Sequence, residues 1–213
     1  MSRAVLFCNG EIKDLEYHKS LLKKDDFIIA VDGGGRYCYR MGICPSVAIG
    51  DFDSLDRSVK DDFVQKGVEI VPFPSDKDYI DMVLGIEEAR KRGYEDILIL
   101  GALGGIRADM FLGNAMALSR FDERILMANE YSSIFFVRDG EERTISGEIG
   151  DYVSLIPLSD LLRTGKSKGL KYQLDQLVFQ RGETRSISNE LIDQSAVIRL
   201  MEGNALVIIQ KRG

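Results

Sequence analysis

The sequence predicts an α/β fold, in which a doubly wound parallel sheet is followed by an antiparallel β domain. Up to about residue 130, short runs that are nearly continuous in apolar residues alternate with helical candidates. Such runs suit strands that are buried on both faces. Beyond that point the helical candidates stop, and strand-like runs follow one another between turns that carry Gly or charge. We therefore expect two compact domains, at residues 1–130 and 131–213.

The elements of the first domain follow from this alternation. We expect strands within 4–10, 27–35, 46–53, 68–73 and 96–105. Helical candidates lie at 11–24, 36–42, 56–66, 78–92 and 109–121. Strands and helices in regular alternation are typical of a parallel sheet with helices on its faces.

The elements of the second domain are expected to be strands alone. The candidate runs lie at 133–140, 142–147, 151–158, 169–175, 177–182, 196–203 and 205–211. Their close spacing and turn residues indicate an antiparallel sandwich or barrel.

Composition limits the function classes. The chain has 213 residues, of which 45% are hydrophobic and 29% charged, as is ordinary for a globular protein. A net charge of −6 without a basic tract argues against nucleic-acid binding. No signal peptide is recognised, and no apolar run approaches the ~18 residues of a membrane span. We expect no membrane partner.

Cysteine and histidine usage narrows the chemistry. The cysteines, Cys8, Cys38 and Cys44, are odd in number and form no CxxC, so a reducing cytoplasm is the expected setting. Cys8 lies in an apolar run and is expected in the core. His18 is the only histidine, and its charged helical stretch predicts a solvated surface position. A Ser-His-Asp site would need His18, and a multi-histidine metal site is impossible.

Acidic residues gather where strands are expected to end. Asp32 follows one apolar run, and Asp51 and Asp53 follow the next, so all three fall on one edge of the sheet. Asp78 and Asp81 are expected to begin a helix, three residues apart and on one face. Singly these residues suit turns and caps. As a set they suit a hard divalent cation such as Mg²⁺, which compensates carboxylates that would otherwise repel.

Two glycine-rich turns lie on the same edge. "DGGGR" at 32–36 and "GALGGIR" at 101–107 each follow a strand and precede a helix. Such turns let backbone N–H groups approach phosphate, although they also form for steric reasons. Neither matches the GxGxxG fingerprint or the Walker A loop. Metal-assisted phosphate chemistry without a P-loop is the expectation, with Lys77, Arg36 and Arg107 as candidates to neutralise phosphate charge.

Taken in order, these motifs resemble those of the thiamine pyrophosphokinase family over nearly the whole chain. The matching segments are "VDGGGRY" at 31–37, "GICPSVAIGDFDSL" at 42–55, "KDYID" at 77–81, "GALGGIRADMFLGN" at 101–114, "GDYVSLIPL" at 150–158, "GLKYQL" at 169–174 and "SNE" at 188–190. Singly only "GDFDS" is fairly specific, whereas the ordered series is highly specific.

The resemblance implies a function and an architecture. It implies an α/β domain that binds ATP and Mg²⁺, followed by a β-sandwich that binds thiamine. It further implies Mg²⁺-dependent transfer of pyrophosphate from ATP to thiamine, giving thiamine diphosphate and AMP. A homodimer is implied as well, with composite active sites in which the first domain of one chain faces the sandwich of the other.

The resemblance also assigns residues by position. It places Asp32, Asp51, Asp53 and Asp81 at the metal, the last three being catalytic as well. The binding positions are Gly33, Gly34, Arg36, Lys77, Asp78, Gly104, Arg107, Asp109, Asn114, Tyr172, Ser188 and Asn189. Tyr172 is a candidate to stack on thiamine, and Asn189 to hydrogen-bond its pyrimidine.

Several positions depart from the family pattern. Ile80 replaces Thr, Val83 replaces Glu, Met110 replaces His, Tyr172 stands where Trp is common, and Ile106 is an extra residue. A non-catalytic sensor of nucleotide or thiamine diphosphate is therefore an alternative, although a sensor need not keep the acidic positions. A nicotinamide-dependent oxidoreductase is the other alternative. The missing GxGxxG and the carboxylate-rich edge argue against it.

Overall fold

The computed structural model describes residues 2–73 and 78–212. Lys77, a predicted phosphate-binding residue, lies outside the described residues. The chain divides into two compact units, Met1–Glu130 and Tyr131–Gly213. No helix of the described part of the chain is long and apolar enough to cross a membrane.

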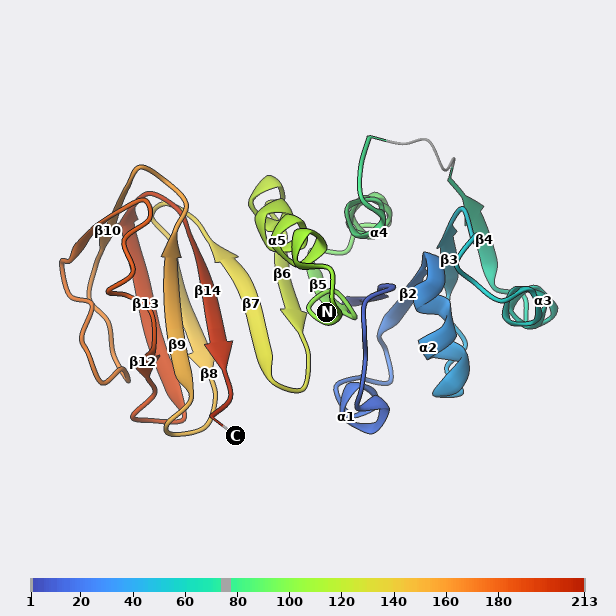
Figure 1. Ribbon diagram of the computed structural model, residues 1–213, viewed down its shortest axis with the longest axis horizontal. Coiled ribbons are helices and arrows are strands. Elements are labelled where there is room, and N and C mark those ends of the chain that lie inside the picture. Colours follow the sequence, from blue (N-terminus) through green and yellow to red (C-terminus); the bar gives the residue numbers. More distant parts are fainter. Residues whose placement is uncertain (1, 74–77, 213) are drawn as a thin grey trace. The chain divides into compact units, whose positions relative to one another are not determined.

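The first unit is built on a parallel sheet, which confirms the predicted fold class (Figure 1). Its strands are β1 (Ala4–Phe7), β2 (Phe27–Val31), β3 (Val47–Gly50), β4 (Glu69–Pro72), β5 (Asp96–Leu100) and β6 (Arg124–Ala128). They are ordered β6-β5-β1-β2-β3-β4 and pair in parallel throughout. Strand β6 is not among the strands that the sequence predicts, and its five residues begin with a charged one.

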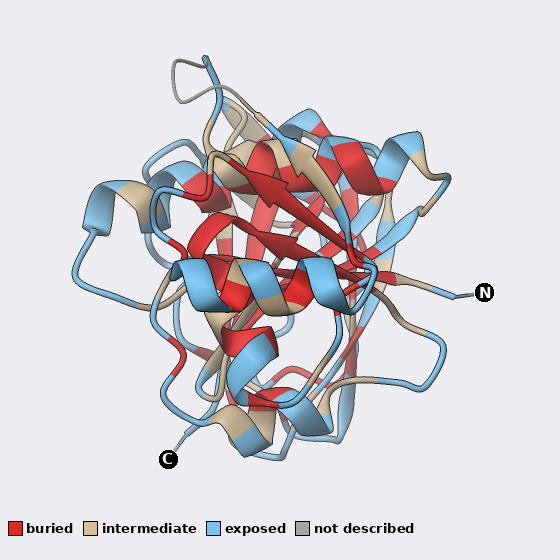
Figure 2. Cartoon of the chain, turned by 90° about the vertical axis from the view of Figure 1, so that its right-hand side faces the viewer, coloured by how far each residue is buried: buried red, intermediate tan, exposed pale blue. Residues whose placement is uncertain are grey.

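Helices cover both faces of this sheet, as Figure 1 shows. They are α1 (Leu15–Ser20), α2 (Gly35–Arg40), α3 (Arg57–Gln65), α4 (Asp81–Lys91) and α5 (Ala108–Ala117), with short 3-10 turns η1 (Asp32–Gly34) and η2 (Leu118–Arg120). Val5 and Phe7 of β1 pack in one core with Phe63 of α3. On the opposite face Gly85 brings α4 close to the side chains of Leu6 and Val31. Figure 2 shows the strands buried between helices whose outer sides are exposed.

The strand order contains a reversal that locates a ligand site. From β1 the chain adds β2, β3 and β4 on one side, and then returns to add β5 and β6 on the other. The loops that follow β1 and β5 therefore leave the sheet in opposite directions. A crevice forms beyond the carboxyl ends of neighbouring strands at such a switch point, and ligands of open α/β sheets bind there.

The second unit is an antiparallel sandwich, as predicted. One layer has the order β12-β9-β14-β7 and the other β11-β10-β13-β8. The strands are β7 (Ser132–Val137), β8 (Glu142–Ser146), β9 (Tyr152–Pro157), β10 (Leu161–Thr164), β11 (Val178–Gln180), β12 (Asn189–Glu190), β13 (Ser195–Glu202) and β14 (Ala205–Gln210). Leu155, Ile198 and Val207 contribute to one core formed by alternate inward-facing side chains.

The structure corrects the prediction of a strand at 169–175. Within it only Leu170 forms a bridge, with Leu191. The Asp175 carboxylate accepts a hydrogen bond from the Ser167 backbone N–H at 2.7 Å, and Gln173 Nε2 donates to the Leu170 carbonyl at 3.0 Å. These local bonds favour turns over a ladder. Conversely, β10 and the two-residue β12 were not predicted, because neither has a long apolar run.

Two predictions in the first unit were also wrong. His18 is fully buried, because α1 turns its ring inward, with Nδ1 2.6 Å from the Asp14 carbonyl oxygen. A single inward position is easily hidden in a charged six-residue helix. Helix α4 begins at Asp81, not at Asp78, since Ile80 has extended backbone angles (φ −66°, ψ 150°). Asp78 is exposed and precedes the helix, so the two carboxylates do not share a helix face.

Candidate active site

Asp32 is the buried member of the predicted acidic set. It begins η1 directly after β2, is 6% exposed and has φ +49°, a conformation uncommon for residues other than Gly. Its Oδ1 has no hydrogen-bond partner among the described residues. Burial raises the pKa of Asp32, and the charges of Asp81 and Asp51 raise it further. Hydrogen bonds from the Gly33 backbone and the Ser54 side chain oppose this shift.

Asp51 and Asp53 follow β3, which pairs with β2, the strand that Asp32 follows. Asp51 Oδ1 accepts a hydrogen bond from the Asp53 backbone N–H at 3.0 Å, and the intervening Phe52 is buried at φ +63°. Gly50, with φ +144°, lies against the Asp32 backbone. Unfavourable backbone angles at Asp32 and Phe52 are the kind of local strain that clusters at functional sites.

These carboxylates fit a hard cation by their chemistry. A buried carboxylate oxygen without a partner, beside two further carboxylates that raise its pKa, is a donor set suited to Mg²⁺. Among residues 2–73 and 78–212, however, no group of three or more His, Cys, Asp or Glu side chains is close enough to hold a metal ion. The protein side chains therefore bring the charges near one another without forming a closed metal cage.

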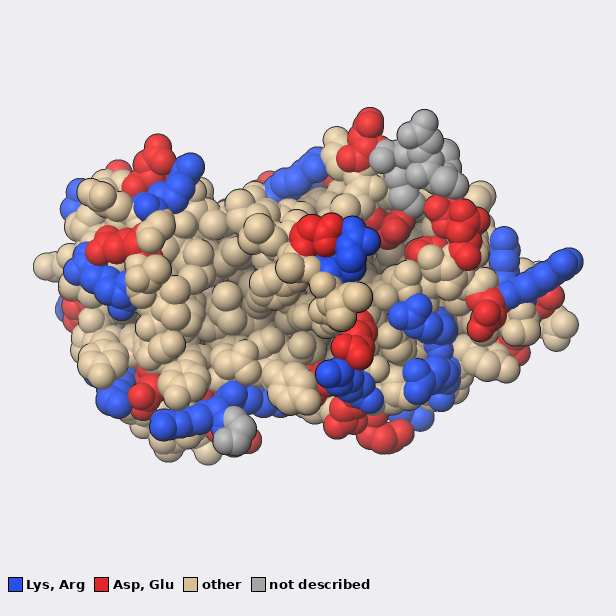
Figure 3. All heavy atoms as spheres, viewed as in Figure 1, with Lys and Arg blue, Asp and Glu red and all other residues tan. Residues whose placement is uncertain are grey.

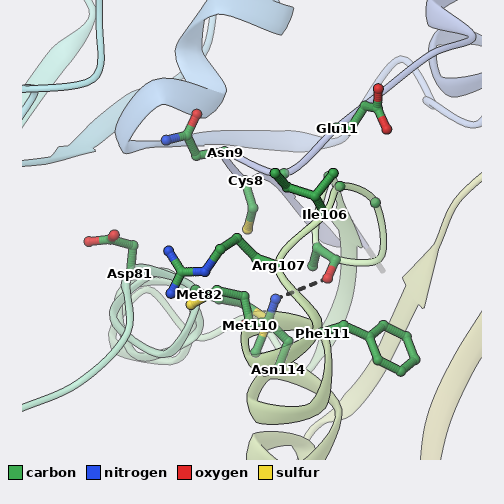
Figure 4. Close-up of a pocket in the computed structure, with 15 residues that line it drawn as sticks. Cys8, Asn9, Glu11, Asp81, Met82, Ile106, Arg107, Met110, Phe111 and Asn114 are labelled. Atoms are coloured by element: carbon green, nitrogen blue, oxygen red, sulfur yellow. Dashed lines mark hydrogen bonds between the residues drawn. The ribbon is translucent and has the colours of Figure 1, made fainter.

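A pocket of about 360 Å³ opens at the switch point between β1 and β5 (Figure 4). Residues 8–11 after β1, residues 101–107 after β5 and the first residues of α4 form its walls. Figure 4 shows the Arg107 side chain extending toward the start of α4, where Asp81 lies. The residues that line the pocket are Cys8, Asn9, Gly10, Glu11, Asp81, Met82, Gly101, Ala102, Gly104, Gly105, Ile106, Arg107, Met110, Phe111 and Asn114.

The predicted phosphate-binding glycines pack against residues 7–11. A Cβ on Gly33 would collide with the Asn9 side chain, and one on Gly34 with the Phe7 carbonyl. A Cβ on Gly104 would collide with the Glu11 carbonyl. The structure therefore gives these glycines a steric role, which holds both glycine-rich loops against the segment that follows β1.

Arg107 and Asp109 form an exposed ion pair at the start of α5. The Arg107 guanidinium contacts the Asp109 carboxylate with Nε at 2.8 Å and Nη2 at 2.5 Å. This pair lowers the pKa of Asp109 to about 2. Asn114 is buried, and its Nδ2 donates to the Ala102 carbonyl at 2.9 Å, which ties α5 to the glycine-rich loop. The extra residue Ile106 is fully exposed.

The second unit has a separate pocket of about 240 Å³ that Tyr172 and Asn189 line. Tyr172 is 61% exposed, as a stacking surface requires. The Asn189 carboxamide is occupied by backbone groups: Oδ1 accepts from the Tyr172 and Glu190 N–H groups at 2.9 Å, and Nδ2 donates to the Tyr172 carbonyl at 2.7 Å. Asn189 thus positions Tyr172. Ser188 precedes it at φ +60° and does not line this pocket.

Charges elsewhere are mixed in sign. Acidic and basic side chains are interspersed on the face that Figure 3 shows. Many form local ion pairs, such as Arg92, which contacts both Glu69 at 2.8 Å and Glu88 at 2.7 Å. Asp32 differs from them, because the charged neighbours that shift its pKa are carboxylates.

Asn9 and the segment around it are not among the site residues that the sequence predicts. Asn9 lies in the run 4–10, two residues after β1 ends, so the signal in the sequence is a polar residue that follows a buried strand on the same edge as Asp32 and Asp51. In the sequence, the predicted phosphate-binding role falls on the glycine-rich motifs at 32–36 and 101–107 instead. In the structure both glycine-rich loops pack against residues 7–11, the segment that contains Asn9.

Comparison with known proteins identifies the family. The family model described as "Thiamin pyrophosphokinase, catalytic domain" matches residues 18–128, and "Thiamin pyrophosphokinase, vitamin B1 binding domain" matches residues 142–204. The chain belongs to the thiamin pyrophosphokinase family. The two matched regions fall in the α/β unit and the sandwich, respectively.

Curated relatives carry the same family name. Thiamine pyrophosphokinase from Bacillus subtilis is 30% identical over 183 residues, which cover 84% of this chain and 85% of that protein. Thiamine pyrophosphokinase 1 from Oryza sativa is 32% identical and covers 79% of this chain and 66% of that protein. These names favour the catalytic interpretation over the sensor alternative.

Solved structures of the family share this fold. The crystal structure of thiamine pyrophosphokinase from Bacillus subtilis aligns with a TM-score of 0.86 at 26% identity, covering all of both chains. The Geobacillus thermodenitrificans structure aligns at 0.83 with 27% identity, over 100% of this chain and 99% of that one. The yeast relative from Candida albicans, at 19% identity and a TM-score of 0.79 over 98% and 88% of the chains, shows the fold alone.

Proposed function

We propose that this chain transfers pyrophosphate from ATP to thiamine in the presence of Mg²⁺, giving thiamine diphosphate and AMP. The observation that carries the proposal is Asp32, which is buried with an unpartnered carboxylate oxygen and has Asp51 and Asp81 as charged neighbours. These carboxylates lie beside a pocket at the switch point of the parallel sheet. The family to which the chain belongs is named for its action on thiamine.

The carboxylates proposed to hold the cation are Asp32, Asp51, Asp53 and Asp81, which would have to draw closer together around it, because no three of them are close enough in this structure. Bound there, Mg²⁺ would neutralise charge on the phosphate chain, which is where charge develops in such transfers. Without the cation these four carboxylates would repel an anionic nucleotide. Asp53 and Asp81 are both candidates to accept the proton of the thiamine hydroxyl, a minor role because phosphoryl transfer needs little help from a base.

The walls of the 360 Å³ pocket are proposed to bind the nucleotide. Arg107 carries a positive charge at its mouth and is paired with Asp109, so it can contact phosphate when that pair opens. Asn114 holds the loop that contains Gly104 through the Ala102 carbonyl. The apolar side chains of Met82 and Met110 supply surface suited to a base or a ribose.

The sandwich unit is proposed to bind thiamine. Tyr172 offers an exposed ring for stacking on the cationic thiazolium or the pyrimidine. Asn189, whose carboxamide is used by the backbone, is assigned the role of positioning Tyr172, and the role of Ser188 is to shape the same segment.

We further propose a homodimer with composite sites in a reducing cytoplasm. Helix α5 exposes Phe111 (41%), Leu112 (60%) and Met116 (45%), which is apolar surface suited to a subunit interface. Cys8, Cys38 and Cys44 are all free thiols, as a reducing compartment favours.

The test is incubation of the protein with ATP, Mg²⁺ and thiamine, followed by chromatography for AMP and thiamine diphosphate. AMP that forms only when thiamine is present establishes both the reaction and its acceptor. Binding of nucleotide and thiamine diphosphate without turnover would instead favour the sensor. ADP as the product would show transfer of a single phosphoryl group and would reject the proposed reaction.

A further inference from the structure

Asn9 stands between the pocket and the carboxylates. It follows β1 at the switch point and lines the 360 Å³ pocket. Its side chain packs against Gly33, where a Cβ would collide with it. The residue is exposed. Asn9 Nδ2 lies 3.5 Å from Asp32 Oδ2, so Asn9 links the pocket lining to the buried carboxylate.

Arg36 fixes the direction of the Asn9 carboxamide. A guanidinium group carries only donors, so it selects the oxygen of a neighbouring amide. Arg36 Nη1 donates to Asn9 Oδ1, and Nη2 donates to the Asn9 backbone carbonyl at 3.0 Å. The amide nitrogen must therefore face away from Arg36, on the side of Asp32. In Figure 4 the Asn9 carboxamide projects from the pocket edge toward α2, which carries Arg36.

The amide nitrogen keeps donor capacity for a ligand. A carboxamide NH₂ group has two hydrogens. Among the described residues its one acceptor is Asp32, at a distance near the limit of a hydrogen bond. Because Asn9 is exposed, the other hydrogen is open to a ligand at the boundary of pocket and carboxylates. An anion at that boundary needs donors there, since the carboxylates supply none.

We propose that Asn9 donates an N–H to a phosphate oxygen of the bound nucleoside triphosphate, and that Arg36 is the positioning residue that aims it. The proposal rests on the proposed function for the identity of the nucleotide. It changes the part expected of Arg36: the guanidinium acts through Asn9, and does not itself contact phosphate.

Tyr37 keeps the loop in place independently of Asn9. Its buried hydroxyl donates to the Gly10 carbonyl at 2.7 Å and accepts from the Ile12 N–H at 3.2 Å and from Arg36 Nη2 at 3.0 Å. Substitutions at Asn9 therefore remove the donor while the loop stays anchored, so such variants are expected to fold.

The test is titration calorimetry with ATP carrying a methylene group between the α and β phosphorus atoms, compared with adenosine, both with Mg²⁺. Asn9→Asp keeps an acceptor for Arg36 and loses the N–H, and Asn9→Ala loses both without adding charge. Each is expected to weaken the analogue roughly 10- to 100-fold, as for a hydrogen bond to a charged group, and to leave adenosine unchanged. Asn204→Asp, in the sandwich, is the control for charge: Asn204 Oδ1 accepts from the Asp139 N–H, a bond that Asp preserves.

Arg36 variants test the positioning role. Arg36→Lys retains a donor for Asn9 Oδ1 and should keep most of the analogue affinity, whereas Arg36→Met should lose it as the Asn9 variants do. Arg40→Met removes an exposed charge from the same helix and is the matched control. Unchanged analogue affinity in Asn9→Ala, or equal losses for the analogue and adenosine, would overturn the inference. Failure to form thiamine diphosphate would reject the proposed function. The role of Asn9 would still be decided by the loss of affinity for the ATP analogue relative to adenosine.

Discussion

The Asp51 carboxylate accepts a hydrogen bond from the backbone N–H of Asp53 at 3.0 Å. This bond closes a tight turn after β3 and sets the two carboxylates on the same edge as Asp32. One oxygen of Asp51 thus shapes the loop, while its charge acts on Asp32, whose pKa it raises. The turn and the charge can be separated by substitution.

Asp51→Asn keeps an oxygen for the turn and removes the charge. Because cation stabilisation of the phosphate chain is expected to supply much of the rate, we predict that Asp51→Asn and Asp53→Asn each lower kcat by roughly 10²–10³-fold. Circular dichroism and the melting temperature should stay near the wild-type values. Asp62→Asn, on helix α3 with Lys66 as its partner, is the control. Full activity of both variants, or of the wild type in excess chelator, would contradict the metal site.

Asp32→Asn should stabilise the protein while it removes the function. The substitution eliminates a buried charge that lies near Asp51 and Asp81, and Asn tolerates the φ of +49° well. We expect a gain of about 0.5–2 kcal/mol in the free energy of unfolding at neutral pH without metal. Added Mg²⁺ should raise the melting temperature of the wild type and not that of the variant. A variant less stable than the wild type in chelator would show that the Asp32 charge is not a source of strain.

The Arg107–Asp109 pair gives a prediction for acid pH. The pair lowers the pKa of Asp109 to about 2, below the ordinary 3.8. A lowered folded-state pKa means that this contribution to stability is present above about pH 4 and is lost as the pH falls toward 2. NMR titration of the Asp109 carboxyl should give the low midpoint in the wild type and an ordinary one in Arg107→Met. Equal midpoints in the two proteins would show that the pair does not persist in solution.

Much of the architecture was predictable because apolar runs dictate it. The strands β1, β2, β3 and β5 are buried along nearly all their length, so their position in the sequence was visible. The edge of the sheet that carries Asp32, Asp51 and Asp81 followed from that topology alone. Short elements without an apolar run, such as β12, form only where the fold provides a partner strand.

The roles of polar side chains were less predictable, because they depend on contacts between distant segments. The sequence predicts that Asn189 hydrogen-bonds a ligand, yet its carboxamide hydrogen-bonds backbone groups of residues 172 and 190. Arg36 reads as a phosphate ligand, yet it binds Asn9, 27 positions earlier. The positions that depart from the family pattern also have different surroundings in the structure. Val83 is only 3% exposed, so a Glu there would bury a charge, whereas Ile80 lies at a helix end.

Ile80 is the N-cap of α4 and makes no side-chain cap hydrogen bond. Thr at this position, as in the family pattern, can accept from the free N–H groups of the first turn. We predict that Ile80→Thr stabilises the protein by about 0.5–2 kcal/mol, the usual range for an N-cap. Ile80→Val is the control, since Val matches Thr in shape and lacks the hydroxyl. Equal melting temperatures for the Thr and Val variants would show that no cap forms.

The proposed composite site can be tested by complementation between inactive chains. Asp81→Asn disables the carboxylate edge, and Tyr172→Ala removes an exposed ring of the sandwich, so neither is expected to unfold its unit. If each site joins the first domain of one subunit to the sandwich of the other, every heterodimer has one site with both changes and one with neither. Random re-pairing of equal amounts then restores roughly a quarter of wild-type sites, by two-fold symmetry.

The result depends on verified subunit exchange, which native mass spectrometry of the mixed dimers measures directly. Heterodimers that form without recovery of activity would mean that each site lies within one chain. Recovery near a quarter would place the pyrophosphate donor and the thiamine on different subunits. Because this assay compares the two variants with their mixture, it leaves the metal-site prediction for Asp51 and Asp53 independent of the outcome.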